Sequence, residues 1–458
     1  MKISQILKNN LSCDSRVLKK GEIFFDLLSN KNQINPFIKN IIAKKPKLII
    51  SSIKLDYKKI KIKKNVKKFY YTIIKKKFPN IPSDLSAVTG TNGKTSVANF
   101  FFQINRLNKI PCANIGTLGY FYNNKYIPSS LTTPDIYKIY EFLNLIKKNK
   151  INKVILEASS HGLNQGRLYG LRFKNSAFTN FSQDHLDYHK SMKSYLNAKL
   201  ILFKKLLKKR ANIICDDKIK KILLNNGVPN KKYKFIMQSK RKFPFKIISN
   251  KAIDSKINVK INHENVIYSL SLNLIGDFQL KNLLQAIALS VSSGLNFKKI
   301  IKVLPQIKPI KGRLNIFKKN NKIVCLDYAH TPDGLEKTIK TLKQHFRKDV
   351  NIVFGCGGNR DIGKRKKMGK IVNNLCKDVI ITDDNPRHEN PVKICKQIQS
   401  AVKKAKIIND RKTAIKKGIK ITGNNAVLLV AGKGHESYQL YKNIKIPFSD
   451  QKVIKESL

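Results

Sequence analysis

Residues 87–96 read Ala87-Val88-Thr89-Gly90-Thr91-Asn92-Gly93-Lys94-Thr95-Ser96 and follow a short apolar segment that we expect to form a β-strand. The glycines at positions 90 and 93 allow a sharp turn in which several backbone N–H groups point at one anion. Lys94 adds a cation, and the hydroxyl of Thr95 or Ser96 can bind magnesium at the start of the next helix. The stretch therefore predicts an α/β fold whose loop holds the phosphates of ATP.

The loop differs at one position from the common phosphate-loop spacing. The pattern G-x-x-x-x-G-K-[ST] places a glycine at position 88, where this chain has Val88. An ordinary glycine turn before a helix is the alternative interpretation of this stretch.

The chain is strongly basic, with 92 Lys and Arg residues against 28 Asp and Glu residues and a formal net charge of +64. Such a charge is typical of proteins that bind nucleic acid. The lysines are spread along the whole chain among asparagines and isoleucines, as in residues 58–65, without a compact basic helix. We interpret the charge as a drift in codon usage that solvated faces tolerate, and we expect no nucleic-acid partner. A basic nucleic-acid-binding ATPase stays open as the alternative from another class.

The 458 residues, of which 41% are hydrophobic, can bury more than one core, and we expect three α/β domains with bounds at 1–83, 84–309 and 310–458. Short apolar segments that alternate with helix-like stretches predict strands in each of them. The predicted strands are 22–27 and 47–51, then 154–157, 176–179 and 211–215 with a β-rich stretch near 243–274, then 323–327, 351–354, 379–382 and 426–430. In the last group each strand ends in a polar or glycine-rich loop, where open α/β sheets bind ligands.

The sequence also bears on location. No segment has the length and composition of a membrane span, and the first residues do not resemble a signal peptide. We therefore expect a cytoplasmic protein that acts as a monomer. The seven cysteines contain no C-x-x-C pair, so we expect reduced, mostly buried thiols.

Carboxylate and imidazole groups follow two of the predicted strands. Glu157 precedes Ala158-Ser159-Ser160-His161-Gly162, and the next strand leads to Asp184-His185-Leu186-Asp187-Tyr188-His189. Beside a phosphate loop, such groups suit magnesium-assisted phosphoryl transfer, so Glu157 and His185 are candidate metal ligands. Loop caps and hydrogen-bonded turns are the alternative role for these residues.

Four motifs occur in an order that resembles the Mur ligases of peptidoglycan synthesis. They are Gly90-Thr91-Asn92-Gly93-Lys94-Thr95, Glu157-Ala158-Ser159-Ser160-His161-Gly162, Asp184-His185-Leu186-Asp187-Tyr188-His189 and Asp327-Tyr328-Ala329-His330-Thr331-Pro332. The resemblance covers all three domains, strongly from residue 84 onward and weakly before it. It implies a small α/β module for a uridine nucleotide, a central P-loop-type ATPase domain with a mostly parallel sheet, and a Rossmann-like carboxy-terminal domain that brings an amino acid.

The resemblance also implies a reaction and its partners. ATP phosphorylates the side-chain carboxylate of D-glutamate in UDP-N-acetylmuramoyl-L-alanyl-D-glutamate, and the amine of the incoming amino acid then displaces the phosphate to form an amide. This chemistry depends on positioning and on the screening of charge, so we expect no covalent enzyme intermediate. Family members that add L-lysine, and folate-type amide ligases with the same phosphate loop, stay open as alternatives.

The family pattern assigns the ATP and metal residues. For ATP it gives Gly90, Thr91, Asn92, Gly93, Lys94, Thr95, Ser96, Asn282, Arg313, Asp327, Tyr328 and His330. It places Thr95 and Glu157 on one Mg²⁺ and His185 on a second. Lys199 falls where the family has a lysine carbamylated by carbon dioxide, which turns a cation into a metal-binding carboxylate. Together with Lys94, Glu157 and His185, it completes the implied catalytic group.

A second group of residues is implied to hold the muramoyl dipeptide. These residues are Cys13, Ser15, Thr132, Thr133, Ser159, Gln165 and Arg167. Hydroxyl, amide and guanidinium groups suit its amides and carboxylates. The stretch Thr132-Thr133-Pro134-Asp135 is also a good helix start, with Pro134 in the first turn. Where the family has an Asp-Gly pair, this chain has Gln33-Ile34, so the uridine contacts there fall to Asn30, Lys31 and Asn32 by position alone.

The third substrate is read from Asp384-Asn385-Pro386-Arg387. This stretch resembles the signature of members that add meso-diaminopimelate, in which the arginine pairs with the far carboxylate of that amino acid. L-Lysine lacks this carboxylate and would leave the guanidinium without a bidentate partner. Arg360, Gly432 and Glu436 match the remaining contacts, and Glu436 is a candidate acceptor for the far ammonium group. A type I turn with proline is the alternative role of residues 384–387.

Overall fold

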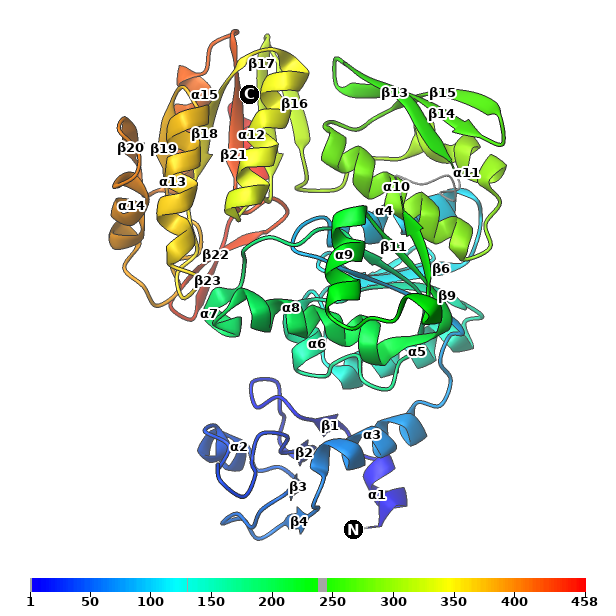
Figure 1. Ribbon diagram of the computed structural model, residues 1–458. Coiled ribbons are helices and arrows are strands. Elements are labelled where there is room, and N and C mark those ends of the chain that lie inside the picture. The colour runs from blue at the N-terminus through cyan, green and yellow to red at the C-terminus, as the bar shows by residue number, and fades with distance from the viewer. Residues whose placement is uncertain (1, 130, 238–244) are drawn as a thin grey trace. The chain divides into compact units, whose positions relative to one another are not determined.

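The computed structural model describes residues 2–129, 131–237 and 245–458 (Figure 1). These residues form two compact units. One comprises Met1–Ser83, Pro134–Asn152 and Gly166–Leu171, and the other comprises Asp84–Thr133, Lys153–Gln165 and Arg172–Leu458. The α/β class with mostly parallel sheets is confirmed. The division into three domains, with bounds after residues 83 and 309, stays a prediction.

The first unit contains a parallel four-stranded sheet in the order β1-β2-β3-β4. Its elements are α1 (Ile3–Leu7), β1 (Leu11–Ser12), β2 (Ile23–Phe25), α2 (Ile38–Ala43), β3 (Leu48–Ser51), β4 (Ile60–Ile62), α3 (Val66–Lys77) and α5 (Ile136–Lys148). Helix α5 packs against α3 and buries Ile136, Ile139, Tyr140 and Leu143, which recur at helical spacing. The two strands predicted here are confirmed as β2 and β3, with shorter bounds.

The second unit begins with an eight-stranded sheet in the order β12-β11-β10-β5-β9-β6-β7-β8. Its strands are β5 (Asp84–Thr89), β6 (Cys112–Gly116), β7 (Gly119–Tyr122), β8 (Lys125–Ile127), β9 (Lys153–Glu157), β10 (Phe173–Phe178), β11 (Leu207–Cys215) and β12 (Lys234–Met237). All pairings from β12 to β6 are parallel, and β7 and β8 extend the edge antiparallel. The loops after β5, β9 and β10 therefore meet at one edge of the sheet.

Helices around this sheet fix the start of α4 (Lys94–Leu107). Its buried Phe100 and Phe101 share one hydrophobic core with Leu283 and Ile287 of α10 (Asp277–Ser292). The other helices here are α6 (Ser160–Asn164), α7 (Leu186–His189), α8 (Met192–Ile201), α9 (Asp217–Asn225) and α11 (Phe297–Val303). Because the core holds α4 rigidly, the loop that precedes it has a defined position.

The β-rich stretch predicted near residues 243–274 is an antiparallel three-stranded sheet. Its strands are β13 (Lys246–Ile253), β14 (Lys256–His263) and β15 (Val266–Leu272). Residues 243 and 244 lie outside the described residues.

The remainder of the second unit is a six-stranded sheet in the order β16-β17-β21-β18-β19-β20, parallel except for β16. The strands are β16 (Asn315–Lys319), β17 (Lys322–Asp327), β18 (Asp349–Phe354), β19 (Val379–Ile381), β20 (Ala405–Ile407) and β21 (Ala426–Ala431). One hydrophobic cluster joins it to α12 (Pro332–Phe346), α13 (Gly363–Leu375) and α14 (Pro391–Gln399), and another to α15 (Arg411–Ile421) and α16 (Asp450–Ser457). The four strands predicted here are confirmed, and a hairpin, β22 (Tyr438–Tyr441) and β23 (Ile444–Pro447), was not foreseen.

Among the described residues, no helix has both the length and the apolar composition needed to span a lipid bilayer. All seven cysteines are free, and five of them are buried.

Candidate active site

Two glycines give the loop between β5 and α4 its shape. Gly90 and Gly93 have φ values of 145° and 86°, which side chains rarely tolerate. A Cβ atom at Gly90 would lie 1.9 Å from Thr179 Oγ1, and one at Gly93 would lie 2.5 Å from Asn282 Oδ1. A larger residue at either position would therefore strain the backbone and force Thr179 or Asn282 to move.

The end of β10 holds this loop through Asn180. The backbone N–H groups of Thr91 and Asn92 donate to the backbone and side-chain oxygens of Asn180, both at 2.9 Å. The Lys94 ammonium bends back and donates to the carbonyls of Gly90 and Thr91, at 2.9 and 2.8 Å. Burial lowers the pKa of Lys94. The helix α4 begins directly after this loop, and the positive end of its dipole can face an anion held there.

Glu157 ends β9 as a buried carboxylate beside this helix start. Its Oε2 accepts from Thr95 Oγ1 at 2.9 Å and from Thr117 Oγ1 at 3.1 Å, and its Oε1 accepts from the Thr117 N–H at 2.8 Å. Burial raises its pKa, and the Thr117 N–H and the Lys94 charge oppose that rise. A hydroxyl and a carboxylate in contact are oxygen donors of the kind that Mg²⁺ prefers.

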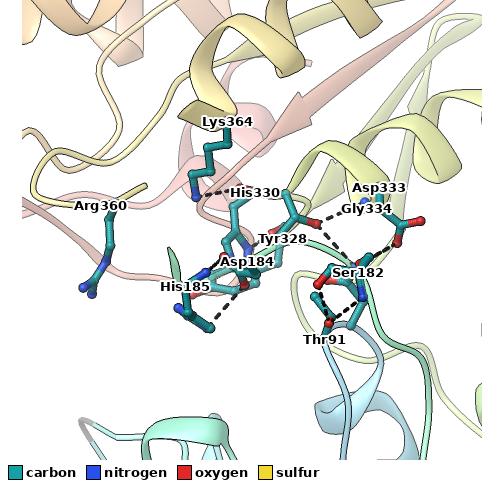
Figure 2. Close-up of polar contacts among 12 residues, drawn as sticks. Thr91, Ser182, Asp184, His185, Tyr328, His330, Asp333, Gly334, Arg360 and Lys364 are labelled. Carbon is teal, nitrogen blue, oxygen red and sulfur yellow. Dashed lines mark hydrogen bonds and ion pairs between the residues drawn. The ribbon is translucent and has the colours of Figure 1, made fainter. Parts of the chain in front are cut away.

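A second polar cluster gathers around Asp184 (Figure 2). Asp184 Oδ2 lies 3.3 Å from His185 Nε2 and 3.9 Å from His330 Nε2. His330 Nδ1 lies 2.8 Å from the Tyr328 carbonyl, and Lys364 donates to the His330 carbonyl at 2.9 Å. Burial lowers the pKa of His185 to about 2 and that of His330 to about 4, so both rings are neutral at physiological pH. A neutral imidazole keeps a lone pair for a metal ion.

Lys199 lies fully buried on α8. Its ammonium nitrogen donates to the Gly90 carbonyl at 2.8 Å and sits 4.4 Å from the centre of the Tyr195 ring. Burial, and then the charge of Lys94, lower its pKa far below the ordinary value. The amine is therefore held close to its neutral, nucleophilic form.

These groups suit a metal ion only in part. Across the described residues, no three His, Cys, Asp or Glu side chains come close enough together to hold an ion. Thr95, Glu157 and His185 can each offer one or two donor atoms, and the remaining ligands of an ion would have to come from phosphate or water.

Hydroxyl groups gather where β9 ends, at Ser159 just after the strand and at Thr132 and Thr133. Thr133 Oγ1 donates to the Glu157 carbonyl at 2.6 Å and lies 2.9 Å from Ser159 Oγ. Thr132 Oγ1 lies 3.0 Å from Thr117 Oγ1. Ser159 caps α6, and Gln165 follows that helix and donates to the Tyr188 hydroxyl at 3.3 Å. Thr132, Thr133, Ser159 and Gln165 thus belong to the second unit.

Cys13, Ser15 and Arg167 belong to the first unit. Cys13 Sγ donates to Asp135 Oδ2 at 3.0 Å, and the Ser15 carbonyl accepts from Lys44 Nζ at 2.6 Å. Burial, reinforced by Asp135, raises the pKa of the Cys13 thiol. Burial lowers the pKa of Arg167, and Asp135 opposes that shift. Asp135 is therefore a charge that acts on both Cys13 and Arg167.

The helix start predicted at residues 132–135 needs one correction. Helix α5 begins at Ile136, and its N-cap is Asp135, whose Oδ1 accepts from the Tyr137 N–H at 2.8 Å. Pro134 precedes the cap and does not lie in the first turn. The carboxylate of Asp135, and not a threonine hydroxyl, supplies the cap.

The loop with Asn30, Lys31 and Asn32 closes on itself. Asn30 and Gln33 exchange backbone hydrogen bonds of 2.9 and 3.2 Å, and Asn32 N donates to Asn30 Oδ1 at 2.9 Å. Below the loop, buried Asp26 accepts from Asn35 Nδ2 at 2.9 Å.

The motif at residues 384–387 opens onto a cavity of about 130 Å³. Its lining includes His185, His330, Arg360, Asn385, Arg387 and Glu436. Arg387 has a φ of 52°, and its Nη1 donates to the Gly358 carbonyl at 2.9 Å. At Gly432, a Cβ atom would lie 2.6 Å from Asp384 Oδ2. The cavity therefore joins the residues predicted for the amino acid to the cluster around Asp184.

Arg313 connects the start of α4 with the segment that follows β17. Its guanidinium lies 4.3 Å from the centre of the Tyr328 ring, and its Nη2 donates to Thr95 Oγ1 at 3.5 Å. Asp327 is buried and accepts from the backbone N–H groups of Leu314 and Ala329, both at 2.8 Å. The structure thus brings Thr95, Arg313, Asp327 and Tyr328 into one network.

Comparison with known proteins gives the family. The Mur ligase middle domain matches residues 88–290, and the Mur ligase glutamate ligase domain matches residues 312–434. The chain belongs to the Mur ligase family. A UDP-N-acetylmuramoyl-L-alanyl-D-glutamate–2,6-diaminopimelate ligase from Rickettsia conorii is 38% identical to this Mur ligase over 97% of the chain and 95% of its own length.

Solved structures agree with this family. A UDP-N-acetylmuramoyl-L-alanyl-D-glutamate–2,6-diaminopimelate ligase aligns with a TM-score of 0.65 and 27% identity, over 98% of this Mur ligase and 94% of that chain. A MurF ligase from Thermotoga maritima, in complex with ADP, aligns with a TM-score of 0.64 at 16% identity over 94% and 95% of the two chains. The second likeness concerns the fold alone.

Sequence reasoning missed three residues of this Mur ligase that shape the site. Thr117 contacts Glu157 twice but lies between two strands that no motif marked. Gln279 accepts from Asn282 Nδ2 at 3.2 Å, and its place three residues before the predicted asparagine was an available signal. Lys433 lies fully buried between Asn385 and Glu436, and among so many lysines its type alone carried no signal.

Proposed function

We propose that this Mur ligase joins meso-diaminopimelate to the D-glutamate side-chain carboxylate of UDP-N-acetylmuramoyl-L-alanyl-D-glutamate, with ATP as the phosphoryl donor. The observation that carries the proposal is the cavity that contains Arg387, Asn385 and Glu436 next to His185 and His330. The far end of meso-diaminopimelate carries a carboxylate for the guanidinium and an ammonium for Glu436. Relatives 35% to 38% identical over nearly the whole chain, named as ligases of this kind, support it.

For ATP, the proposal uses the start of α4 and a second cavity. Lys94 would exchange its two loop carbonyls for phosphate oxygens, and Arg313 would screen charge on the transferring group. A cavity of about 720 Å³ lies against Gln279, Ile310, Arg313 and Leu314. It has room for an adenosine, and the Asn282 amide donates to Gln279, one of the residues that line it.

Thr95 with Glu157 would hold one Mg²⁺, and His185 a second, each together with phosphate oxygens. The ion would supply neutralisation of charge on the phosphoryl oxygens. Lys199 suits carbamylation, because its amine nitrogen, held near the neutral form, can bond to the carbon of CO₂ and release one proton. The product is a carboxylate, which removes a buried cation from beside Lys94.

The reaction itself needs orientation more than a nucleophilic side chain. A glutamate carboxylate oxygen bonds to the γ-phosphorus as the bond to ADP breaks, and the amine nitrogen then bonds to the acyl carbon as phosphate leaves. One cavity is lined by residues of both groups, Asp184 among them at one side and Arg387 among the residues proposed for the amino acid. These residues would bring the amine and the acyl phosphate together. Neutral His330, whose Nε2 lies 3.9 Å from Asp184 Oδ2, lines the same cavity and would face these reacting groups.

The test is phosphate release by the purified protein with ATP, the UDP-linked dipeptide and a panel of amino acids. We expect turnover with meso-diaminopimelate and a kcat/KM for L-lysine lower by about 100-fold, the value of one charged bidentate contact. Arg387→Ala should lower kcat/KM for meso-diaminopimelate by a similar factor and leave that for L-lysine nearly unchanged. Equal use of both amino acids by the wild-type protein would contradict the proposed substrate. Phosphate release that requires RNA or DNA instead would indicate a nucleic-acid-dependent ATPase.

A further inference from the structure

The loop after β21 carries Lys433, whose side chain is buried behind residues that line the amino-acid cavity. Gly432 and Gly434 flank Lys433 with φ values of 110° and 52°, conformations that side chains rarely adopt. The Lys433 side chain has 0% exposure. An ammonium buried this deeply costs folding free energy unless charged partners satisfy it, so its contacts are informative.

The hydrogen bonds of Lys433 go to two residues of the proposed amino-acid site. Lys433 Nζ donates to Asn385 Oδ1 at 3.0 Å and to Glu436 Oε2 at 2.9 Å. Asn385 Nδ2 donates to the same Glu436 oxygen at 2.9 Å, and the Leu440 N–H donates to Asn385 Oδ1 at 2.9 Å. The three side chains form a closed triangle of hydrogen bonds, in which each polar atom of the Asn385 amide has a fixed direction.

The triangle leaves one part of Glu436 for a ligand. Its Oε2 accepts two bonds from within the triangle, whereas among the described residues its Oε1 accepts only a 3.4 Å bond from the Tyr328 hydroxyl. Oε1 is therefore the oxygen that can receive an ammonium hydrogen from the cavity. Without Lys433, the Glu436 carboxylate would keep only the Asn385 amide on Oε2 and could rotate away from its present direction.

We propose that Lys433 is a positioning residue that holds Asn385 and Glu436 in the orientation that recognises the far ammonium group of the amino acid substrate. The inference rests on the proposed function, since it needs an amino acid with a second ammonium group. Lys433 acts through its two neighbours and does not touch the substrate. Lys433 should therefore affect how well the enzyme distinguishes amino acids that carry the far ammonium group from those that lack it.

The experiment compares meso-diaminopimelate with 2-aminopimelate, which keeps the far carboxylate for Arg387 and lacks the far ammonium. Phosphate release is measured for the wild-type protein, Lys433→Met and the control Lys322→Met. Lys322 bonds to the Ile419 carbonyl at 3.1 Å, at the opposite end of β17 from Asp327. We expect Lys433→Met to lower the ratio of kcat/KM for meso-diaminopimelate over 2-aminopimelate by about 10-fold or more through KM, as loss of one charged hydrogen bond does. Lys322→Met should keep the wild-type ratio.

A ratio in Lys433→Met that equals the wild-type ratio, whether or not both kcat/KM values fall, would overturn the inference while the proposed function stands. A wild-type protein that does not use meso-diaminopimelate would overturn both. If Lys433→Met does not fold, Lys433→Met/Glu436→Gln, which leaves no unpaired charge in the loop, is compared with Glu436→Gln. The two should then share one ratio within about 3-fold, because the carboxylate that Lys433 holds is already absent. A further 10-fold fall would contradict the positioning role.

Discussion

Arg411 and Asp450 form a fully buried, two-pronged ion pair, in which Arg411 Nε and Nη2 donate to the two carboxylate oxygens of Asp450, both at 2.8 Å. The same guanidinium donates to the carbonyls of Ala431 and Asp383, at 2.9 and 3.3 Å. These carbonyls lie at the end of β21 and just beyond β19, directly before the residues predicted for the amino acid. The pair therefore fixes both strand ends at the cavity.

Removal of one partner should be costly, because the other charge stays buried. We expect Arg411→Met to lower the free energy of unfolding by about 3–5 kcal/mol, and Arg411→Met/Asp450→Leu to regain most of it. Urea unfolding of the wild type, both single variants and the double variant measures this directly. A double variant as unstable as Arg411→Met would show that the backbone contacts of the guanidinium, and not the pair, carry the stability.

Glu157→Gln tests the carboxylate beside the phosphate loop. The amide keeps the shape of the side chain but removes the charge that Thr95 and Thr117 now contact. We expect kcat for phosphate release to fall by about 100-fold or more, with little change in thermal stability. Glu141→Gln, which breaks an exposed pair with Lys138, is the matched control and should keep full activity. Full activity of Glu157→Gln would remove this residue from the proposed metal site.

Lys199 should respond to carbon dioxide. Wild-type protein depleted of carbon dioxide is expected to lose activity and to regain it when bicarbonate is added, because the near-neutral amine reacts again. Lys199→Ala should be inactive under both conditions. Isotope-labelled bicarbonate gives a carbamate signal in the wild-type spectrum that the variant lacks. A fully active Lys199→Ala would refute the carbamate assignment.

The fold and the site were predictable to different degrees. Strands β9, β10, β17 and β21 follow from local apolar patterns, and the chemistry at their ends follows from short motifs. Contacts between distant segments, such as Cys13 with Asp135, have no local signal, so the place of α5 in the first unit was not foreseen. For the same reason Thr117 was missed, since it reaches Glu157 only once the sheet has formed.

His435 should make stability depend on pH. Burial, with Arg313, Lys311 and Lys433 nearby, lowers its pKa to about 3. An unfolded histidine takes up a proton near pH 6.5, so below that pH the unfolded chain binds more protons and the free energy of unfolding falls. Urea unfolding at pH 7 and pH 5 should show a larger loss for the wild type than for His435→Gln. An equal loss of stability in both proteins would show that His435 does not cause the pH dependence.

The close approach at Gly90, Gly93 and Gly432 has a consequence for how such a chain can change over generations. A gene that drifts toward lysine and asparagine codons can alter most exposed positions at little cost. Change at these three is costly, because a single added carbon would meet Thr179, Asn282 or Asp384 at 2.6 Å or less on a backbone with positive φ. Substitution at these glycines would therefore disturb the phosphate loop or the amino-acid cavity, whereas an added lysine on an exposed face disturbs neither.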